Sequence, residues 1–267
     1  MQLRVCILNT GLFHFLYRMK RTLLIICFQA MGGAMLYAQP VKSTENINQV
    51  WLGYLNQTRF SNKWGMWTDL HLRTKEDFTN NFSQAIIRLG LTYYIDNNTK
   101  ITAGYARVFL FPGDNHKDIT QPEHRPWQQV QWHTAFTKTR LMQWIRLEER
   151  FRRKIANDAM LADGYNFNWR LRYNIWYEVP LIKNGLVPQS LSFIANDELH
   201  INFGKEIVYN YFDQNRFFLG LKYQFTKTSN VQFGYMNLFQ QLSTGNKYKN
   251  ITTARIFFFQ NLDLRKK

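Results

Sequence analysis

The stretch from Tyr165 to Val179 constrains the fold more than any other part of this 267-residue chain. Over fifteen residues, apolar side chains alternate with mostly polar ones. A period of two predicts a β-strand with two different faces. Strands of soluble proteins usually have five or six residues, whereas a strand that crosses a bilayer at a tilt needs about 9–11. The stretch therefore predicts a membrane-spanning barrel strand, with its apolar face toward lipid and its polar face toward a wet lumen.

The same alternation recurs from residue 48 onward. It predicts ten further strands at 48–60, 64–75, 82–95, 100–111, 127–138, 141–153, 190–201, 216–226, 230–242 and 250–262. Because bacterial barrels have an even number of strands, we expect one more strand from 40–47 or from within 202–215. The fold class is thus all-β: an antiparallel transmembrane β-barrel of about twelve strands, with ten as the alternative.

The links between these strands alternate in length. Short links are predicted at 61–63, 96–99, 138–140, 181–189 and 227–230, and longer ones at 76–81, 112–126, 154–164, 202–215 and 243–249. Outer-membrane barrels have short periplasmic turns and long external loops. The alternation therefore predicts which end of each strand faces the periplasm.

The amino terminus has the charged, apolar and small-residue regions of a secretory signal. These regions are Met19-Lys20-Arg21, residues 22–28 and residues 30–38. We expect translation to start at Met19 and cleavage to follow Ala38, with Ala34 as the alternative site. The predicted organisation is a signal peptide at 1–38 and a single barrel domain at 39–267.

Removal of this signal changes the composition that matters for function. Both cysteines, Cys6 and Cys27, lie within it, so the predicted mature chain has no disulfide, no thiolate metal ligand and no cysteine nucleophile. The net charge of the whole chain is +16, and Lys and Arg are scattered over every strand and turn. A nucleic-acid site would gather them into one stripe, so we expect no nucleic-acid partner.

Five ordered motifs resemble those of a known family. They are Trp51-Leu52-Gly53-Tyr54, Leu147-Glu148-Glu149-Arg150-Phe151, Asp163-Gly164-Tyr165-Asn166-Phe167, Asp197-Glu198 with Asn202-Phe203-Gly204, and Phe212-Asp213-Gln214-Asn215-Arg216. Together they resemble the uncharacterised barrels grouped as domain of unknown function 2490, over nearly the whole mature chain. The resemblance implies an outer-membrane location in a Gram-negative bacterium and supplies no established activity and no catalytic residue.

Charged residues on the polar faces of two neighbouring predicted strands are the candidate lumen-lining residues. They are Arg146, Glu148, Arg150 and Arg152 on one strand, and Arg170, Arg172 and Glu178 on the next. One interpretation is a charge ladder that holds the barrel interior together; the other is an electropositive constriction that selects anionic solutes. Glu149 falls on the opposite face, where a charge at mid-bilayer costs about 2 kcal/mol or more, so we expect it near the rim or at a bulge.

An enzyme is the alternative from a different class. A membrane-embedded, lipid-modifying hydrolase would use His200, Ser192 and Glu198, which share one strand face, or His133 with Thr134. Residues two apart on a strand are about 7 Å apart, and the chain has no Gly-x-Ser-x-Gly nucleophile elbow. We therefore predict a protein that is not an enzyme.

A metal site is a further alternative. The predicted loop at 112–126 carries five residues of metal-binding type: Asp114, His116, Asp118, Glu123 and His124. These side chain types can bind a divalent cation, but the preferred interpretation is a solvated polar loop. No metal and no cofactor is predicted.

The sequence thus predicts a structural envelope protein or a small anion-leaning pore with an Arg-rich lumen. The expected partners are outer-membrane lipids, lipopolysaccharide phosphates at the loop and rim cations, and small anionic solutes. Barrel-assembly and periplasmic chaperone machinery are also expected, because residues 251–262 resemble the aromatic-rich last strand that this machinery recognises.

Overall fold

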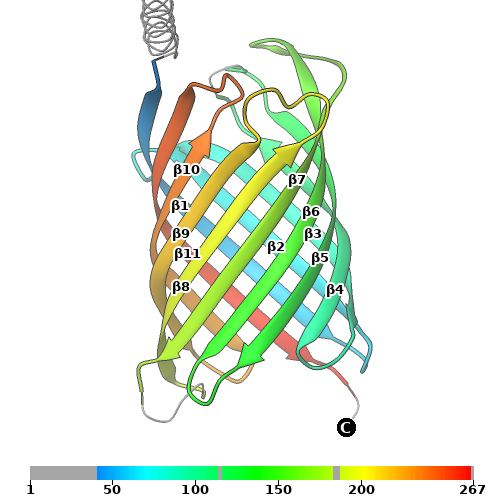
Figure 1. Cartoon of the computed structure of the whole chain (residues 1–267), viewed down its shortest axis with the longest axis vertical. Coiled ribbons are helices and arrows are strands. Elements are labelled where there is room, and N and C mark those ends of the chain that lie inside the picture. The colour runs from blue at the N-terminus through cyan, green and yellow to red at the C-terminus, as the bar shows by residue number, and fades with distance from the viewer. Residues whose placement is uncertain (1–40, 114–115, 183–186, 266–267) are drawn as a thin grey trace, which may run out of the picture. The chain divides into compact units, whose positions relative to one another are not determined.

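The computed structural model describes residues 41–113, 116–182 and 187–265. Within them, one sheet of eleven strands closes on itself into a barrel (Figure 1). The strands are β1 Ser43–Arg59, β2 Trp64–Glu76, β3 Asn80–Tyr94, β4 Thr99–Leu110, β5 Gln121–Ala135, β6 Arg140–Asn157, β7 Met160–Pro180, β8 Ser190–Phe203, β9 Phe212–Gln224, β10 Ser229–Gln241 and β11 Lys247–Asp263. The predicted all-β barrel is confirmed. The predicted signal peptide at 1–38 lies outside the described residues, and no helix among those residues is long and apolar enough to cross a membrane.

The barrel closes through a parallel pair, which corrects the predicted strand number. Every neighbouring pair is antiparallel except β1 and β11, which run in parallel register from Ser43 opposite Lys247 to Arg59 opposite Asp263. With eleven strands, the first and the last point the same way, so they can close the sheet only by parallel pairing. The described residues thus contain neither twelve strands nor ten. Residues 43–47 extend β1, and residues 204–211 form a link.

Two of the predicted long loops, 112–126 and 154–164, are shorter in the structure than the sequence suggests. Both lie at the end of the barrel opposite the carboxyl terminus. β6 and β7 continue through most of the predicted loop at 154–164 and are joined by residues 158–159 alone. Figure 1 shows this hairpin rising beyond its neighbours. β5 begins at Gln121, inside the predicted loop at 112–126. The long links that remain among the described residues are 111–120, 181–189 and 204–211, so the difference in length between the two ends is weaker than the sequence suggests.

The two faces of the sheet reverse the arrangement of a soluble protein. Large apolar side chains stand on the outer surface, and polar and charged side chains turn inward. Outward examples are Leu89, Leu91 and Tyr93 on β3, Leu171, Tyr173 and Ile175 on β7, and Phe217 and Leu219 on β9. In the described chain, 32 polar or charged residues are buried against 13 apolar ones. Because charged residues are seldom fully buried unless they are paired, the interior must satisfy its own charges.

Glu149 lies on the outer face, as its alternation predicts, but not at a bulge. It stands in regular register opposite Trp169, and the register shifts of this strand pair come later, after Arg153. Gln128 donates a hydrogen bond to its carboxylate at 3.4 Å. Of the two expected positions, near the rim or at a bulge, the register excludes the bulge.

Inward-facing glycines leave room for aromatic rings in the interior. A Cβ atom at Gly90 would lie 2.8 Å from the indole of Trp127, and one at Gly53 would lie 2.7 Å from the ring of Phe257. Contacts that short do not occur between real side chains, so these rings lie over positions that only glycine can occupy without a shift.

Candidate functional site: the charged lumen

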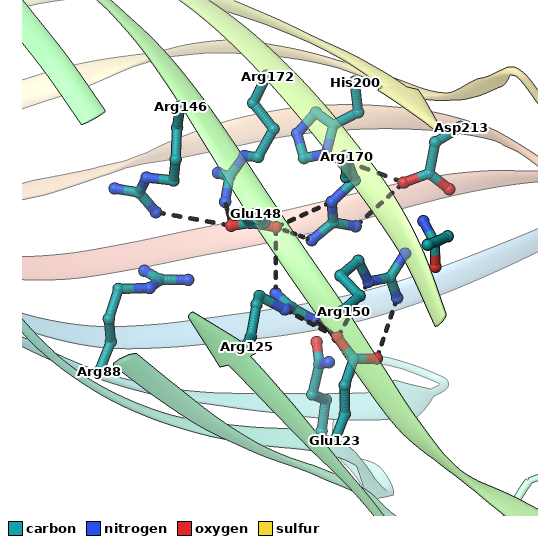
Figure 2. A network of polar contacts seen from close by, with 12 residues as sticks. Arg88, Glu123, Arg125, Arg146, Glu148, Arg150, Arg170, Arg172, His200 and Asp213 are labelled. Carbon is teal, nitrogen blue, oxygen red and sulfur yellow. Dashed lines mark hydrogen bonds and ion pairs between the residues drawn. The ribbon is translucent and has the colours of Figure 1, made fainter. Parts of the chain in front are cut away.

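Glu148 on β6 is the centre of the interior charge network. Its side chain is fully buried. Arg170 donates from Nε at 2.9 Å and from Nη2 at 2.5 Å to Oε2, and Arg172 donates from Nη1 to Oε1 at 2.6 Å. Arg125 and Arg146 lie within 3.6 Å and 3.9 Å of the same carboxylate. Figure 2 shows the four guanidinium groups converging on this single carboxylate from both sides.

Glu123 on β5 is a second fully buried carboxylate that holds three arginines. Arg125 donates to its Oε1 at 2.8 Å and 2.5 Å. Arg150 reaches both oxygens, at 3.0 Å and 3.1 Å, and Arg152 donates to Oε2 at 2.9 Å. Arg125 thus connects Glu123 to Glu148, and the two clusters form one network (Figure 2).

The network continues onto β8 and β9. Arg170 donates to Asp213 at 3.0 Å, and Arg172 donates from Nε to Glu198 at 2.6 Å. Arg216 lies 3.5 Å from the other oxygen of Glu198. The whole network contains seven arginines and four carboxylates. The network therefore carries a net positive charge, although its arginines are paired with carboxylates.

Strand register brings these residues together. Arg146, Glu148 and Arg150 alternate along β6, so all three face inward. Directly opposite them on β7 stand Arg172, Arg170 and Asn168. Residues directly opposite on neighbouring strands have Cβ atoms about 4.5–5.5 Å apart, so the alternation alone places guanidinium and carboxylate groups within reach.

Two further ion pairs lie in the interior outside this network. Arg88 donates to Asp69 at 2.6 Å, and the indole of Trp67 donates to the same carboxylate oxygen at 2.7 Å. Lys222 donates to Glu178 at 2.8 Å. Six of the seven predicted lumen residues thus belong to one network: Arg146, Glu148, Arg150, Arg152, Arg170 and Arg172. The seventh, Glu178, is interior but paired separately.

The wall formed by β11, β1 and β2 carries arginines that no described carboxylate neutralises. Arg73 donates to the amide oxygen of Gln84 at 2.7 Å, and Arg255 lies 3.5 Å from the amide oxygen of Gln232. Among the described residues, no carboxylate lies within 4 Å of either guanidinium group. Positive charge on this wall is therefore available to a solute.

A cavity of about 680 Å³ lies inside the barrel beside both walls. Its lining includes Glu45 and Gln240 toward one end and Gln57 and Asn261 toward the other. Arg73 and Arg255 line it, as do the network arginines Arg170 and Arg172. The side chains thus leave part of the lumen unfilled along its length.

The structure does not bring the three hydrolase candidates together. His200 Nε2 lies 3.0 Å from Glu198 Oε1, without the alignment of a hydrogen bond. Ser192 lies eight residues earlier on the same strand, which is about 26 Å away. His133 contacts Gln131 at 2.9 Å, and Thr134 points to the other face of the strand. Neither set places a hydroxyl beside an imidazole.

The residues of the metal alternative also separate. Because residues 121–135 form a strand, Glu123 points inward to its arginines and His124 points outward to Tyr105 and Arg107. His116 Nδ1 lies 2.9 Å from the carbonyl oxygen of Ile119. Asp114 lies outside the described residues. No group of three metal-ligating side chains occurs in the described part of the chain.

Sequence reasoning missed the partners on β5 and β9, above all Glu123, Arg125 and Asp213. The signal was present: Gln121, Glu123, Arg125, Trp127, Gln129 and Gln131 alternate along one face. Pro122 and Pro126 suggest a loop instead, because proline cannot donate a ladder hydrogen bond. Both prolines nevertheless lie within β5. The pairing of β5 with β6 is interrupted between His124 and Trp127.

Comparison with known proteins identifies a family. No curated protein matches this sequence. Among solved structures, a NanC porin in a rhombohedral crystal form is similar, with 10% sequence identity, a TM-score of 0.44, and coverage of 76% of this chain and 93% of that one. The family model described as "Protein of unknown function (DUF2490)" matches residues 48–249, which span most of the barrel. The chain therefore belongs to the DUF2490 family.

Proposed function

We propose that this protein is an outer-membrane β-barrel of a Gram-negative bacterium whose lumen is a narrow, anion-selective passage. One observation carries the proposal: arginines outnumber carboxylates in a partly unfilled lumen whose lining residues lie toward both ends. A ring or cluster of fixed cations selects for anions. Small anionic solutes are the proposed cargo.

The outer surface supports the membrane location. Its large exposed side chains are mostly Leu, Ile, Phe and Tyr, distributed over every strand of the barrel. Contiguous apolar surface of this extent on a soluble monomer would be an aggregation liability, whereas a barrel in lipid needs it. The strands have 12 to 21 residues, enough to cross the hydrocarbon core at a tilt.

The second candidate function is a structural envelope protein without conductance. The many arginine partners of Glu123 and Glu148 favour it, because five arginine–carboxylate contacts join the neighbouring strands β5, β6 and β7. Such a network stiffens the part of the barrel formed by β5, β6 and β7, whether or not solutes pass through the lumen.

Conductance of the purified protein in planar lipid bilayers tests the proposal. We expect discrete steps with a reversal potential that favours anions in a salt gradient. The double variant Arg73→Gln, Arg255→Gln should move the reversal potential toward zero, since both charges face the cavity without a carboxylate partner. The double variant Arg73→Lys, Arg255→Lys is the matched control, because it keeps both charges. A folded barrel that gives no steps would overturn the passage and favour the structural role; cation-favouring steps would overturn anion selectivity.

A lipid hydrolase has less geometric support, since Ser192 and His200 are far apart on β8. A direct assay is release of fatty acid from phospholipid vesicles by the purified barrel. We expect none above the rate of an empty-vesicle control. Release that disappears in His200→Ala would replace the passage with an enzyme.

A further inference from the structure

The wall formed by β11, β1 and β2 carries its arginines beside an extended apolar surface, which continues inside the barrel over β7 to β10. A single cluster of buried apolar side chains forms this surface: Trp51, Trp176, Ile194, Phe218, Met236, Leu238, Ile251 and Phe257. Most of these side chains also line the cavity. Bacterial barrels usually have polar interiors. Because this apolar surface faces inward, it does not touch lipid, and contact with the membrane does not explain it.

Arg73, Trp51 and Arg255 stand side by side on this wall. Trp51 on β1 lies directly opposite Arg73 on β2 and directly opposite Arg255 on β11. The guanidinium carbon of Arg73 lies 3.6 Å from the centroid of the indole ring. Gln49 fixes that ring by accepting a hydrogen bond from its Nε1 at 2.9 Å. The indole is therefore held in place between two cationic positions.

A third arginine approaches from β9. The guanidinium carbon of Arg216 lies 5.0 Å from the same indole centroid, and that of Arg255 lies 3.3 Å from the ring centroid of Phe218. Each of the three guanidinium groups thus lies over an aromatic ring, a contact that attracts a cation to the ring face.

These arginines keep hydrogen-bonding capacity that the protein does not use. The Nε atoms of Arg73, Arg216 and Arg255 are all buried and have no hydrogen-bond partner. Arg255 is 8% exposed. Glu198, the acidic residue that acts on Arg255 electrostatically, is already paired with Arg172 and Arg216.

The chemistry of the wall selects one kind of ligand. Guanidinium groups match the planar geometry of a carboxylate, and binding pockets typically combine an apolar lining with a few directed polar groups. A small inorganic anion would leave the apolar surface unused, and a neutral apolar molecule would leave the charges of Arg73 and Arg255 without a counter-charge. We propose that this wall is a binding site for organic carboxylates with an apolar body, whose carboxylate contacts Arg73 and Arg255 and whose body lies on the apolar cluster.

Binding of three matched probes to the purified barrel in nanodiscs of uncharged lipid tests the site. The probes are 2-naphthoate, which has both parts, 2-naphthalenemethanol, which lacks the charge, and acetate, which lacks the body. We expect saturable binding of 2-naphthoate by titration calorimetry, after subtraction of empty nanodiscs, with at least about tenfold weaker binding of the other two. Equal affinity for acetate would overturn the apolar part of the site, and equal affinity for the alcohol would overturn the role of the arginines.

Single substitutions locate the site on the wall. Arg73→Gln and Arg255→Gln should each weaken 2-naphthoate binding about tenfold, the effect of losing one charged hydrogen-bonding partner. Arg140→Gln is the matched control, because Arg140 lines the same cavity at the first residue of β6 and should leave the affinity unchanged. Heat-dependent mobility on gels checks that each variant is folded. Unchanged affinity in both folded variants, or an equal loss in Arg140→Gln, would overturn the assignment.

The binding site rests on the proposed function in one respect: solutes must be able to enter the lumen. The experiments can overturn either proposal without overturning the other. Binding of 2-naphthoate by a barrel that gives no conductance steps would keep the site and overturn the passage. Conductance steps from a barrel that binds no 2-naphthoate would keep the passage and overturn the site.

Discussion

Single residues show how this interior tolerates so many charges. Glu148 is fully buried and lies within 4 Å of four arginines. Its alternation with Arg146 and Arg150 predicts an inward position from the sequence alone. The sequence does not reveal that Glu123 and Asp213 complete the network, because Glu123 lies between two prolines and Asp213 lies at the end of a polar segment, and both segments resemble loops.

Loss of the charge on Glu148 should destabilise the barrel strongly. In Glu148→Gln, four guanidinium groups lose their common counter-charge, and breaking a buried pair costs about 3–5 kcal/mol. Urea unfolding of the barrel in lipid vesicles, followed by tryptophan fluorescence, measures the change. Glu149→Gln is the control on the next residue of the same strand. Glu149 faces outward and accepts a long hydrogen bond from Gln128 at 3.4 Å, so the stability of this variant should hardly change. Equal losses in both variants would show that the network does not stabilise the fold.

Glycine at position 90 should be required for packing of the interior. In Gly90→Ala, the new Cβ would lie 2.8 Å from Trp127 and 2.9 Å from Thr102, and overpacking of this kind costs about 1–3 kcal/mol. Gly113→Ala provides the comparison, since its nearest neighbour would be 3.8 Å away. The same urea titration measures both. A stable Gly90→Ala barrel would mean that the indole can move aside at no cost.

At the scale of elements, strand alternation carries most of the predictive power. All eleven stretches identified by alternation are strands, and the best of them, within β7, is the longest strand of the described barrel. Errors concentrate at strand ends, because alternation fades where a strand leaves the barrel wall and becomes a two-stranded hairpin, as β6 and β7 do. The parallel closure was not predictable, since the alternation pattern of a strand carries no information about its neighbour's direction.

A pair of cysteines should report the closure between β1 and β11. Val50 lies directly opposite Ala254 in the parallel register, and neighbouring strands are about 4.8 Å apart, a separation that a disulfide can span. In a chain without Cys6 and Cys27, Val50→Cys with Ala254→Cys should cross-link on oxidation, measured by mass spectrometry of the linked peptides. Val50→Cys with Ile256→Cys, displaced by two residues, should cross-link poorly. Equal yields, or no link in either, would contradict the register.

At the scale of the whole molecule, apolar side chains face outward and polar side chains face inward. Both the sequence pattern and the structure show this distribution. The alternation in the sequence predicts one apolar and one polar face for each strand, and closure of the barrel turns the polar faces inward. Which solutes the interior accepts was not predictable, because that depends on pairs of residues such as Trp51 and Arg255 that lie about 200 positions apart and meet only when the barrel closes.

Lipids with brominated acyl chains should distinguish the two faces. Trp64 is 43% exposed on the outer surface and Trp127 is fully buried inside. Bromine quenches a neighbouring indole, so Trp64→Phe should remove part of the lipid-dependent quenching in reconstituted barrels, whereas Trp127→Phe should leave it unchanged. The opposite result, or no quenching at all in the parent protein, would argue against insertion of this surface into lipid.

The parallel pair of β1 and β11 has a consequence for the folding of the barrel. It joins 17 residues at the beginning of the barrel to strand partners 204 positions later, the most distant contacts in the sheet. Such contacts form slowly because a long loop must close first. The backbone groups along one edge of β1 therefore stay unpaired until the last strand arrives, and an open strand edge invites pairing with other chains. For this barrel, protection of the first strand against aggregation must last for as long as the final strand takes to join the sheet.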